Sequence, residues 1–200
     1  MDKKIKGDST ALPDLAGMAQ HINSAARWAN LALPQNLTAQ LKAFCNQVQQ
    51  GREPLHLQSN SVKGACALFS GPHASGKTLA AEAIANALHL ELYRIDLEAV
   101  VSKYIGETEK NLRKLFDAAK DAGVILFFDE ADALFGKRTE VKDAHDRYAN
   151  LEVSYLLQLI ADHAGVVILA TNSNAALDNA FIRRLRNIVT LPFPSAEAPS

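Results

Sequence analysis

The segment Gly71-Pro72-His73-Ala74-Ser75-Gly76-Lys77-Thr78 has the residue types and spacing of a phosphate-binding loop. It follows an apolar run at residues 65–69 and precedes an alanine-rich helical pattern that begins at Leu79. The two glycines allow a tight turn in which consecutive backbone N–H groups point at phosphate oxygens, and the following helix adds the positive end of its dipole. A glycine turn with a chance lysine is the alternative, and partners further along the chain decide between the two.

Side chains of this segment have distinct expected roles in binding a nucleotide. Lys77 is expected to reach the β and γ phosphates, and the hydroxyl of Thr78 is expected to bind Mg2+. The predicted nucleotide-binding set is Gly71, Pro72, His73, Ala74, Ser75, Gly76, Lys77, Thr78, Leu79 and Asp129.

Two adjacent carboxylates, Asp129 and Glu130, follow an uninterrupted apolar run at residues 124–128. Such a run is typical of a central strand that is buried on both faces, and ligands bind at the carboxyl ends of strands in open α/β sheets. We expect Asp129 to hold Mg2+ through water and Glu130 to orient and polarise the water that attacks the γ-phosphate. Solvated acids at a strand end are the alternative.

Residues 129–132 also spell the Asp-Glu-Ala-Asp tetrapeptide of the DEAD-box helicases. Those enzymes need a Ser-Ala-Thr motif, a second recombinase-like domain and an arginine-rich signature, and the sequence shows none of these. We therefore treat this match as coincidence.

From residue 65 onward, short apolar runs alternate with amphipathic helical patterns, which is the signature of a parallel sheet covered on both faces. Strands are predicted at residues 65–69, 90–96, 124–128, 166–170 and 188–191. Helical periodicity predicts helices after the phosphate loop, over about 108–121 and over about 151–160. Before residue 65 the pattern predicts a weak helix over 14–26, an extended segment over 28–34 and a helix over 36–51.

Composition limits the classes of function. The 200 residues are 48% hydrophobic and have a formal net charge of −1, which suits one domain with a full-sized core and gives no long-range field for nucleic acid or an anionic membrane. Cys45 and Cys66 are isolated, so we expect small buried side chains and a reducing compartment. Without an apolar stretch long enough for a signal peptide or a membrane span, we expect a soluble, cytoplasmic protein with no membrane insertion.

Residues 166–172, Val-Val-Ile-Leu-Ala-Thr-Asn, end a predicted strand with an amide, Asn172, placed to contact the γ-phosphate or the attacking water. With the phosphate loop, Asp129-Glu130 and the segment Leu177-Asp178-x-Ala180-x-x-Arg183, this order of motifs closely resembles the AAA clade of AAA+ ATPases. The resemblance covers residues 28–194. It implies an α/β P-loop NTPase fold with a five-stranded parallel sheet in the order 5-1-4-3-2, helices on both faces, Mg2+-dependent ATP hydrolysis and assembly into a ring, usually a hexamer.

The resemblance also divides the chain into three parts. Residues 1–26 are expected to form a leader that is partly helical or disordered, and residues 27–194 the ATPase core. Residues 195–200 are expected to begin the helical lid, which carries the family's sensor 2 position and half of the nucleotide pocket. We expect the isolated core to bind nucleotide weakly and to hydrolyse it slowly.

Lys103, Tyr104, Ile105 and Gly106 stand where the family has the loop that lines the pore of the ring and grips polypeptide. The resemblance implies that Tyr104 stacks against a threaded chain, while an ordinary half-buried aromatic residue is the alternative. Residues 136–148 take the place of the second pore loop, with a merely solvated charged loop as the alternative.

Arg183 and Arg186 stand where the family places arginine fingers, which enter the neighbouring subunit's site and make hydrolysis depend on assembly. The usual Arg-Pro-Gly-Arg-Phe-Asp is replaced here by Arg-Arg-Leu-Arg-Asn-Ile at residues 183–188, so Arg184 is a third candidate and Arg183 the first choice. A surface residue or a salt-bridge partner is the alternative for any one of the three. The family's adenine-contacting segment is also replaced, with residues 28–34 in its neighbourhood. Glu130, Asn172, Arg183 and Arg186 form the predicted catalytic set, with Asn172 at the sensor 1 position.

The predicted function is ATP-driven remodelling, unfolding or disassembly of a protein substrate by a ring of identical subunits. A nucleotide-switched assembly scaffold is the first alternative. A DNA-directed motor is the second, and the near-neutral charge and Tyr104-Ile105-Gly106 argue against it. Residues 134–150 are also similar to bacterial AAA proteins associated with phage-tail-like contractile injection systems, which suggests recycling of a protein assembly.

Overall fold

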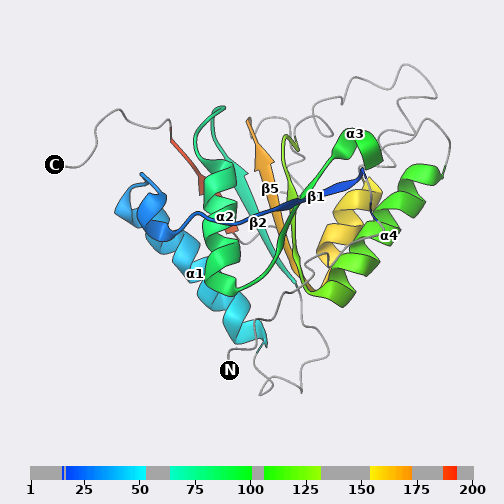
Figure 1. Ribbon diagram of the computed structural model, residues 1–200, viewed down its shortest axis with the longest axis horizontal. Helices are drawn as coiled ribbons and strands as arrows, with labels where there is room; N and C mark the ends of the chain where they lie inside the picture. Colours follow the sequence, from blue (N-terminus) through cyan, green and yellow to red (C-terminus); the bar gives the residue numbers. More distant parts are fainter. Residues whose placement is uncertain are drawn as a thin grey trace, which may run out of the picture.

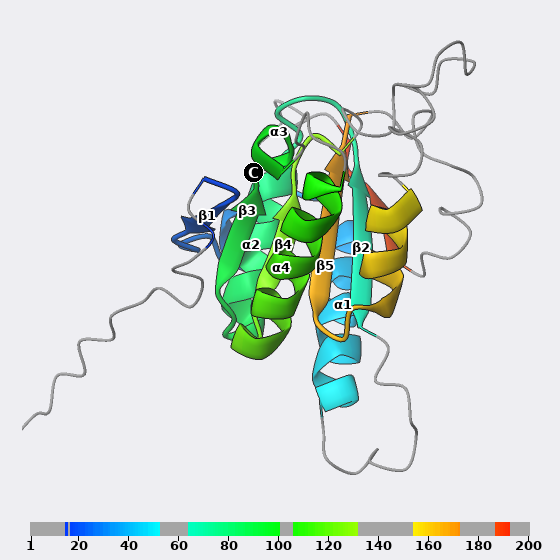
Figure 2. The ribbon, with the colours of Figure 1, turned by 90° about the vertical axis from the view of Figure 1, so that its right-hand side faces the viewer.

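The computed structural model of the chain describes residues 15, 17–52, 64–100, 106–131, 154–172 and 187–192. Its elements in chain order are β1 (Ala19–Ile22), η1 (Trp28–Asn30), α1 (Gln35–Arg52), β2 (Ala65–Ser70), α2 (Lys77–Leu88), β3 (Leu92–Ile95), α3 (Leu97–Val100), α4 (Glu107–Ala122), β4 (Ile125–Phe128), β5 (Val166–Thr171) and β6 (Asn187–Thr190). Residues 154–162 form a further helix before β5. In Figure 1 and Figure 2, α1 and α2 cover one face of the sheet, and α4 and the helix at 154–162 cover the other.

The strands lie in the order β1-β3-β4-β5-β2-β6. The five strands expected from the sequence are β2, β3, β4, β5 and β6, and they are parallel to one another in the predicted order 5-1-4-3-2. This confirms the α/β class, and helices on both faces agree with it. The sheet is larger than predicted, because β1 adds a sixth, antiparallel strand beside β3.

The expected weak helix over residues 14–26 is wrong where β1 forms. Leu15 is buried against the core, and Met18 and Ala19 pack beside it, so this segment is held along the edge of β3. The Asp96 N–H donates to the Met18 carbonyl at 3.0 Å, and Ala19 pairs with Ile95. Pairing with a strand edge satisfies backbone groups that the edge otherwise leaves unpaired, and it outweighs a weak local helix preference.

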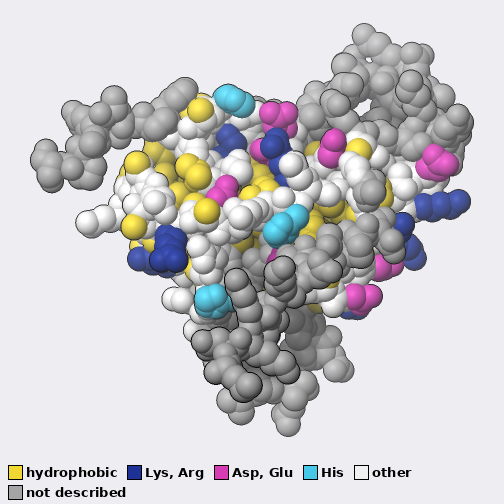
Figure 3. Space-filling model, in the orientation of Figure 1, with side chains coloured by type: hydrophobic (Ala, Val, Ile, Leu, Met, Phe, Trp, Pro, Cys, Tyr) yellow, Lys and Arg dark blue, Asp and Glu magenta, His cyan; other side chains and the backbone are white. Residues whose placement is uncertain are grey.

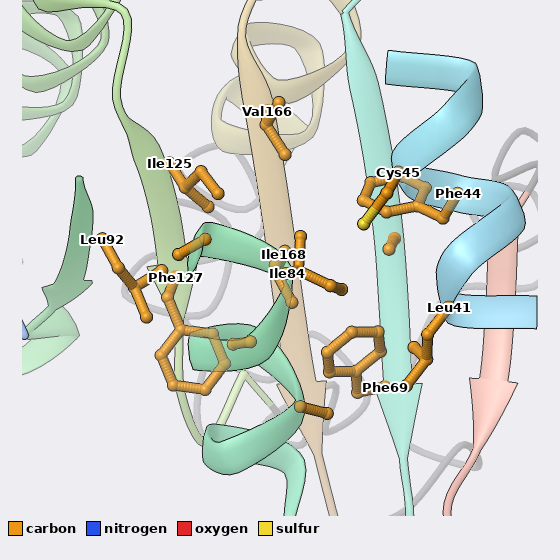
Figure 4. Close-up of a cluster of buried hydrophobic side chains, with 14 of the residues drawn as sticks. Leu41, Phe44, Cys45, Phe69, Ile84, Leu92, Ile125, Phe127, Val166 and Ile168 are labelled. Atoms are coloured by element: carbon orange, nitrogen blue, oxygen red, sulfur yellow. The ribbon is translucent and has the colours of Figure 1, made fainter. Parts of the chain in front are cut away.

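Alternation along the strands divides the core into two clusters, one on each face of the sheet. Leu126 and Phe128 pack with α4 on one face, while Ile125 and Phe127 pack with α2 on the other. Figure 4 shows the second cluster, in which Phe127 and Ile84 lie between the strands and α2. Every residue of β4 and β5 is buried, as predicted from their uninterrupted apolar runs.

Smaller differences concern the segment before β2. Trp28–Asn30 forms a short 3-10 helix where an extended segment was predicted, and the Asn30 side chain accepts a hydrogen bond from the Arg27 N–H at 2.8 Å. Cys45 is buried as expected, whereas Cys66 in β2 is half-buried and packs against the core. Removal from water raises the pKa of the Cys45 thiol to about 11 and that of the Cys66 thiol to about 12.

The described surface shows no single dominant sign of charge on the face drawn in Figure 3, where basic and acidic side chains lie among one another. This agrees with a formal net charge of −1. None of the helices in the described part of the chain combines the length and apolar character that a membrane crossing needs.

Candidate active site at the carboxyl ends of the strands

Strand alternation brings residues from three strands to the face that α2 covers. Leu92, Phe127 and Ala170 belong to the core cluster on that face. Side chains two positions further along point the same way, since successive residues of a strand alternate between faces. Arg94, Asp129 and Asn172 occupy those positions. The parallel strands therefore deliver them to the same edge of the sheet, beside the loop that connects β2 to α2.

That loop turns tightly because its glycines permit it. Gly76 has φ +86° and ψ 17°, in the left-handed region that side chains disfavour, and it forms the N-cap of α2. The Ala80 N–H donates to the Gly76 carbonyl at 2.9 Å, so the helix begins directly at the loop. The amino end of α2 consequently faces the space above the strands, where its N–H groups and dipole favour an anion.

Gly71 is required for a different reason, which is the close approach of β6. The Leu191 N–H donates to the Ser70 carbonyl at 2.6 Å, and the Ser70 hydroxyl donates to Thr190 Oγ1 at 3.2 Å. A Cβ atom on Gly71 would lie far inside van der Waals contact with the Leu191 carbonyl oxygen and 2.9 Å from Ser75 Oγ. The loop can therefore start only with a residue that lacks a side chain.

Gly71→Ala is expected to lower the free energy of unfolding by about 1 to 3 kcal/mol, since the added methyl group forces the end of β6 away from the loop. Urea denaturation measures the change. Gly51→Ala is the matched control, because a Cβ there meets nothing within 4 Å and the position lies in α1. The control is expected to be neutral or slightly stabilising. A Gly71→Ala chain as stable as the original would contradict this account of the loop.

Lys77, in the first turn of α2, joins the loop to β5. Its Nζ atom donates to the Gly71 and Pro72 carbonyls, both at 2.8 Å, and to Asn172 Oδ1 at 3.1 Å. The side chain is 92% buried by the loop around it, since its relative exposure is 8%. Residues 77 and 172, which are 95 positions apart in the sequence, are thus in direct contact.

Asp129 and Glu130 follow β4 in a bent backbone. Glu130 has φ +53°, a left-handed conformation that is costly for a residue with a side chain. Two contacts hold the bend: the Glu130 N–H donates to Asp129 Oδ1 at 3.0 Å, and the Ala131 N–H donates to the Ala170 carbonyl at 2.8 Å. The bend places two consecutive carboxylates at one edge of the same space.

These residues enclose a pocket of about 370 Å3. It is lined by His73, Ala74, Ser75, Gly76, Lys77, Thr78, Leu79, Arg94, Asp129, Glu130 and Asn172. Of the predicted nucleotide-binding set, Gly71 and Pro72 contribute to the loop but do not line this pocket. Glu130 and Asn172 of the predicted catalytic set lie in it.

The pocket has features that suit a polyphosphate and a divalent cation. Ser75 Oγ is buried in the loop without a hydrogen-bond partner among the described residues, which is uncommon for a buried hydroxyl. Within the described ranges, no group of three His, Cys, Asp or Glu side chains is placed to bind a metal by itself. The oxygens of Thr78 and Asp129, which both line the pocket, fit Mg2+, because this ion is commonly held by one or two protein oxygens together with substrate phosphates and water.

Arg94 is the pocket residue that the sequence analysis missed. Its Nη2 atom lies 2.9 Å from Asp129 Oδ2, and the side chains are 48% and 16% exposed, respectively. The alternation of side chains along β3 could have pointed to it. In the strand Leu-Tyr-Arg-Ile, Arg94 lies on the same face as the buried Leu92, where an apolar residue is expected.

Several residues with predicted functional roles lie outside the part of the chain that the structure describes. They are Lys103, Tyr104 and Ile105 of the first pore loop, residues 136–148, and Arg183, Arg184 and Arg186. Gly106, the last residue of the pore-loop prediction, is described: it has φ +79° and forms the N-cap of α4. Glycine adopts this left-handed conformation at little cost, so α4 begins at Gly106 without strain, and the role of Gly106 in a pore loop stays a prediction.

The sequence model of the ATPase family associated with various cellular activities (AAA) matches residues 67–193, which is more than half of the chain. The chain belongs to the AAA family of ATPases. This confirms the family predicted from the four motifs. The narrower similarity of residues 134–150 to proteins of contractile injection systems stays a prediction.

Named AAA relatives match the chain over about two thirds of its length. An uncharacterized AAA family ATPase of Sinorhizobium fredii, y4kL, is 39% identical over 130 residues, which cover 64% of this chain and 39% of the relative. The proteasome-activating nucleotidase of Methanoregula boonei is 38% identical over 140 residues, which cover 65% and 31%. The spastin homolog of Caenorhabditis elegans is 36% identical over 143 residues, which cover 68% and 27%. The matched region thus spans less than two fifths of these AAA relatives.

Among solved structures, the FIGL-1 AAA domain in complex with ADP superimposes on this chain with a TM-score of 0.66. The match covers 90% of this chain and 60% of that domain at 24% identity. At this identity the match supports the AAA fold.

Proposed function

We propose that this AAA domain binds ATP with Mg2+ and hydrolyses it in the pocket between the loop at 71–78 and the ends of β4 and β5. The observation that carries the proposal is the convergence of Lys77, Asp129, Glu130 and Asn172 on one pocket at the amino end of a helix. Family membership supports the same chemistry.

Each residue has a specific proposed role. The loop N–H groups and Lys77 bind the phosphates, and Thr78 and Asp129 hold Mg2+, which when bound neutralises charge on the phosphates. Glu130 accepts a proton from the attacking water and orients it, since its exposed carboxylate borders the pocket. Asn172, already within hydrogen-bond distance of Lys77 Nζ, contacts the γ-phosphate or that water.

We further propose that the complete protein works as a ring. Arg183 or Arg186, with Arg184 as the third candidate, enters the neighbouring subunit's pocket and stabilises the charge that develops on the γ-phosphoryl group. Membership of the AAA family, from which the resemblance implied assembly into a ring, supports the ring. The cytoplasm is the proposed location.

The proposed output of the ring is remodelling of a protein substrate, with Tyr104 gripping the polypeptide. Tyr104→Ala is expected to weaken binding of fluorescently labelled unfolded casein by about tenfold or more, since aromatic anchors dominate such contacts. Fluorescence anisotropy with the assembled protein in the presence of ATP measures the affinity. Tyr155→Ala, which removes a tyrosine that contacts Arg113 on α4, is the matched control. Unchanged casein binding by Tyr104→Ala would favour the scaffold alternative.

A further inference from the structure

The sequence motifs give no role to Arg94, the one strongly basic pocket residue besides Lys77 among those that the structure describes. It lies on β3, a strand that contributes no residue to the predicted nucleotide-binding set. Its guanidinium contacts the carboxylate that is proposed to hold Mg2+, with 2.9 Å between Nη2 and Oδ2. An arginine and the water shell of a divalent cation both donate hydrogen bonds to a carboxylate, so Arg94 and a Mg2+ ion held through water compete for the Asp129 side chain.

The charges around the pocket make this contact matter. Asp129 and Glu130 are consecutive carboxylates that line the space proposed for a triphosphate of high negative charge. Lys77 donates to the loop carbonyls and to Asn172, while Arg94 contacts Asp129, the first carboxylate of this pair. Without a cation beside it, Asp129 repels an incoming phosphate group. Because 48% of its side chain is exposed, Arg94 has room to turn toward solvent or phosphate when Mg2+ binds to Asp129.

We propose that Arg94 is a charge-balancing residue of the nucleotide pocket, which holds Asp129 while Mg2+ is absent and yields it to the metal when Mg2+ and nucleotide bind together. This inference rests on the proposed function. In this arrangement Arg94 substitutes for part of the metal's charge, and therefore reduces the dependence of nucleotide binding on Mg2+. Arg94 acts as a positioning residue, because it acts on the nucleotide through Asp129.

The test compares nucleotide affinity with and without Mg2+ in the 200-residue chain. Arg94→Gln is expected to weaken binding of fluorescent ATP in EDTA by about fivefold, the effect of losing roughly one moderately exposed ion pair. In saturating Mg2+ its affinity is expected to stay within about twofold of the original chain, since the metal then neutralises Asp129. Arg113→Gln is the matched control: it removes the same charge from exposed α4, where the arginine contacts Tyr155, and is expected to change neither affinity.

Arg94→Lys separates charge from structure. The lysine keeps the positive charge, so the affinity of the Arg94→Lys variant for fluorescent ATP in EDTA is expected to remain within about twofold of that of the original chain. Thermal unfolding of each variant establishes that it is folded under the binding conditions. If Arg94→Gln does not fold, the side-chain Nε resonance of Arg94 in the original chain is followed by NMR instead. That resonance is expected to shift on addition of Mg2+ with ATP and to shift much less with ATP in EDTA.

The outcomes distinguish this inference from the function on which it rests. If the original chain binds no ATP under either condition, the proposed function fails. If it binds ATP and Arg94→Gln weakens binding equally with and without Mg2+, or in neither condition, the charge-balancing role is overturned while the proposed function stands. An Arg94→Lys variant as impaired in EDTA as Arg94→Gln also overturns it, as does an NMR response that is the same with and without Mg2+.

Discussion

Lys77→Ala is expected to weaken ATP binding by about a hundredfold or more. The variant removes a charged donor to the phosphates, and hydrogen bonds with a charged partner contribute about 1.5 to 3 kcal/mol each. It also removes the three contacts through which Lys77 joins the Gly71 and Pro72 carbonyls to Asn172, so the loop loses its internal support. Isothermal titration calorimetry with Mg2+ and a slowly hydrolysed ATP analogue measures the affinity.

Lys110→Ala is the matched control for Lys77→Ala. Lys110 is exposed on α4 and does not line the pocket, so the same change in charge and side-chain volume is expected to leave the affinity within about twofold. Affinity that survives in Lys77→Ala would show that the phosphates bind elsewhere.

Glu130→Gln is expected to separate ATP binding from hydrolysis. The amide has nearly the same shape as the carboxylate but accepts no proton from water, and loss of a general base typically slows the chemical step by about 10² to 10⁴-fold. Binding is expected to change little, because Glu130 is proposed to act on the water and Asp129 on the metal. Single-turnover hydrolysis of radiolabelled ATP, measured beside a binding titration, gives both quantities.

Glu109→Gln serves as the control for Glu130→Gln, because Glu109 is an exposed residue in the first turn of α4 and lies outside the pocket. Its hydrolysis rate is expected to match that of the original chain. A normal rate in Glu130→Gln would remove Glu130 from the catalytic role, and a loss of binding in that variant would point to a structural role in the bend after β4.

The fold followed from the sequence where local pattern and burial agree. Apolar runs such as 124–128 become strands that are buried on both faces. The order of these strands in the sheet was predicted from the resemblance to the AAA family, which the order of the motifs indicates. β1 was missed because its four residues, Ala-Gln-His-Ile, carry little strand signal of their own. It forms because Leu15 and Ala19 pack on the core and the edge of β3 offers unpaired backbone groups.

The site was predictable to the extent that its residues carry a motif. Lys77, Asp129 and Asn172 lie in recognisable local sequences, and the structure brings all three to one pocket. Arg94 carries no motif, and its importance arises only from the register that sets β3 beside β4. The roles of Tyr104, Arg183 and Arg186 stay predictions, since they depend on neighbouring subunits and lie outside the described residues.

One triphosphate is expected to bind where Lys77, Asp129 and Asn172 converge. A crystal structure of the Glu130→Gln chain with Mg2+ and ATP tests it most directly. We expect the loop at 71–78 to surround a triphosphate, with the γ-phosphate against Lys77 and Asn172 and Mg2+ on the side of Thr78 and Asp129. A nucleotide bound at another site, with this pocket unchanged, would contradict the account.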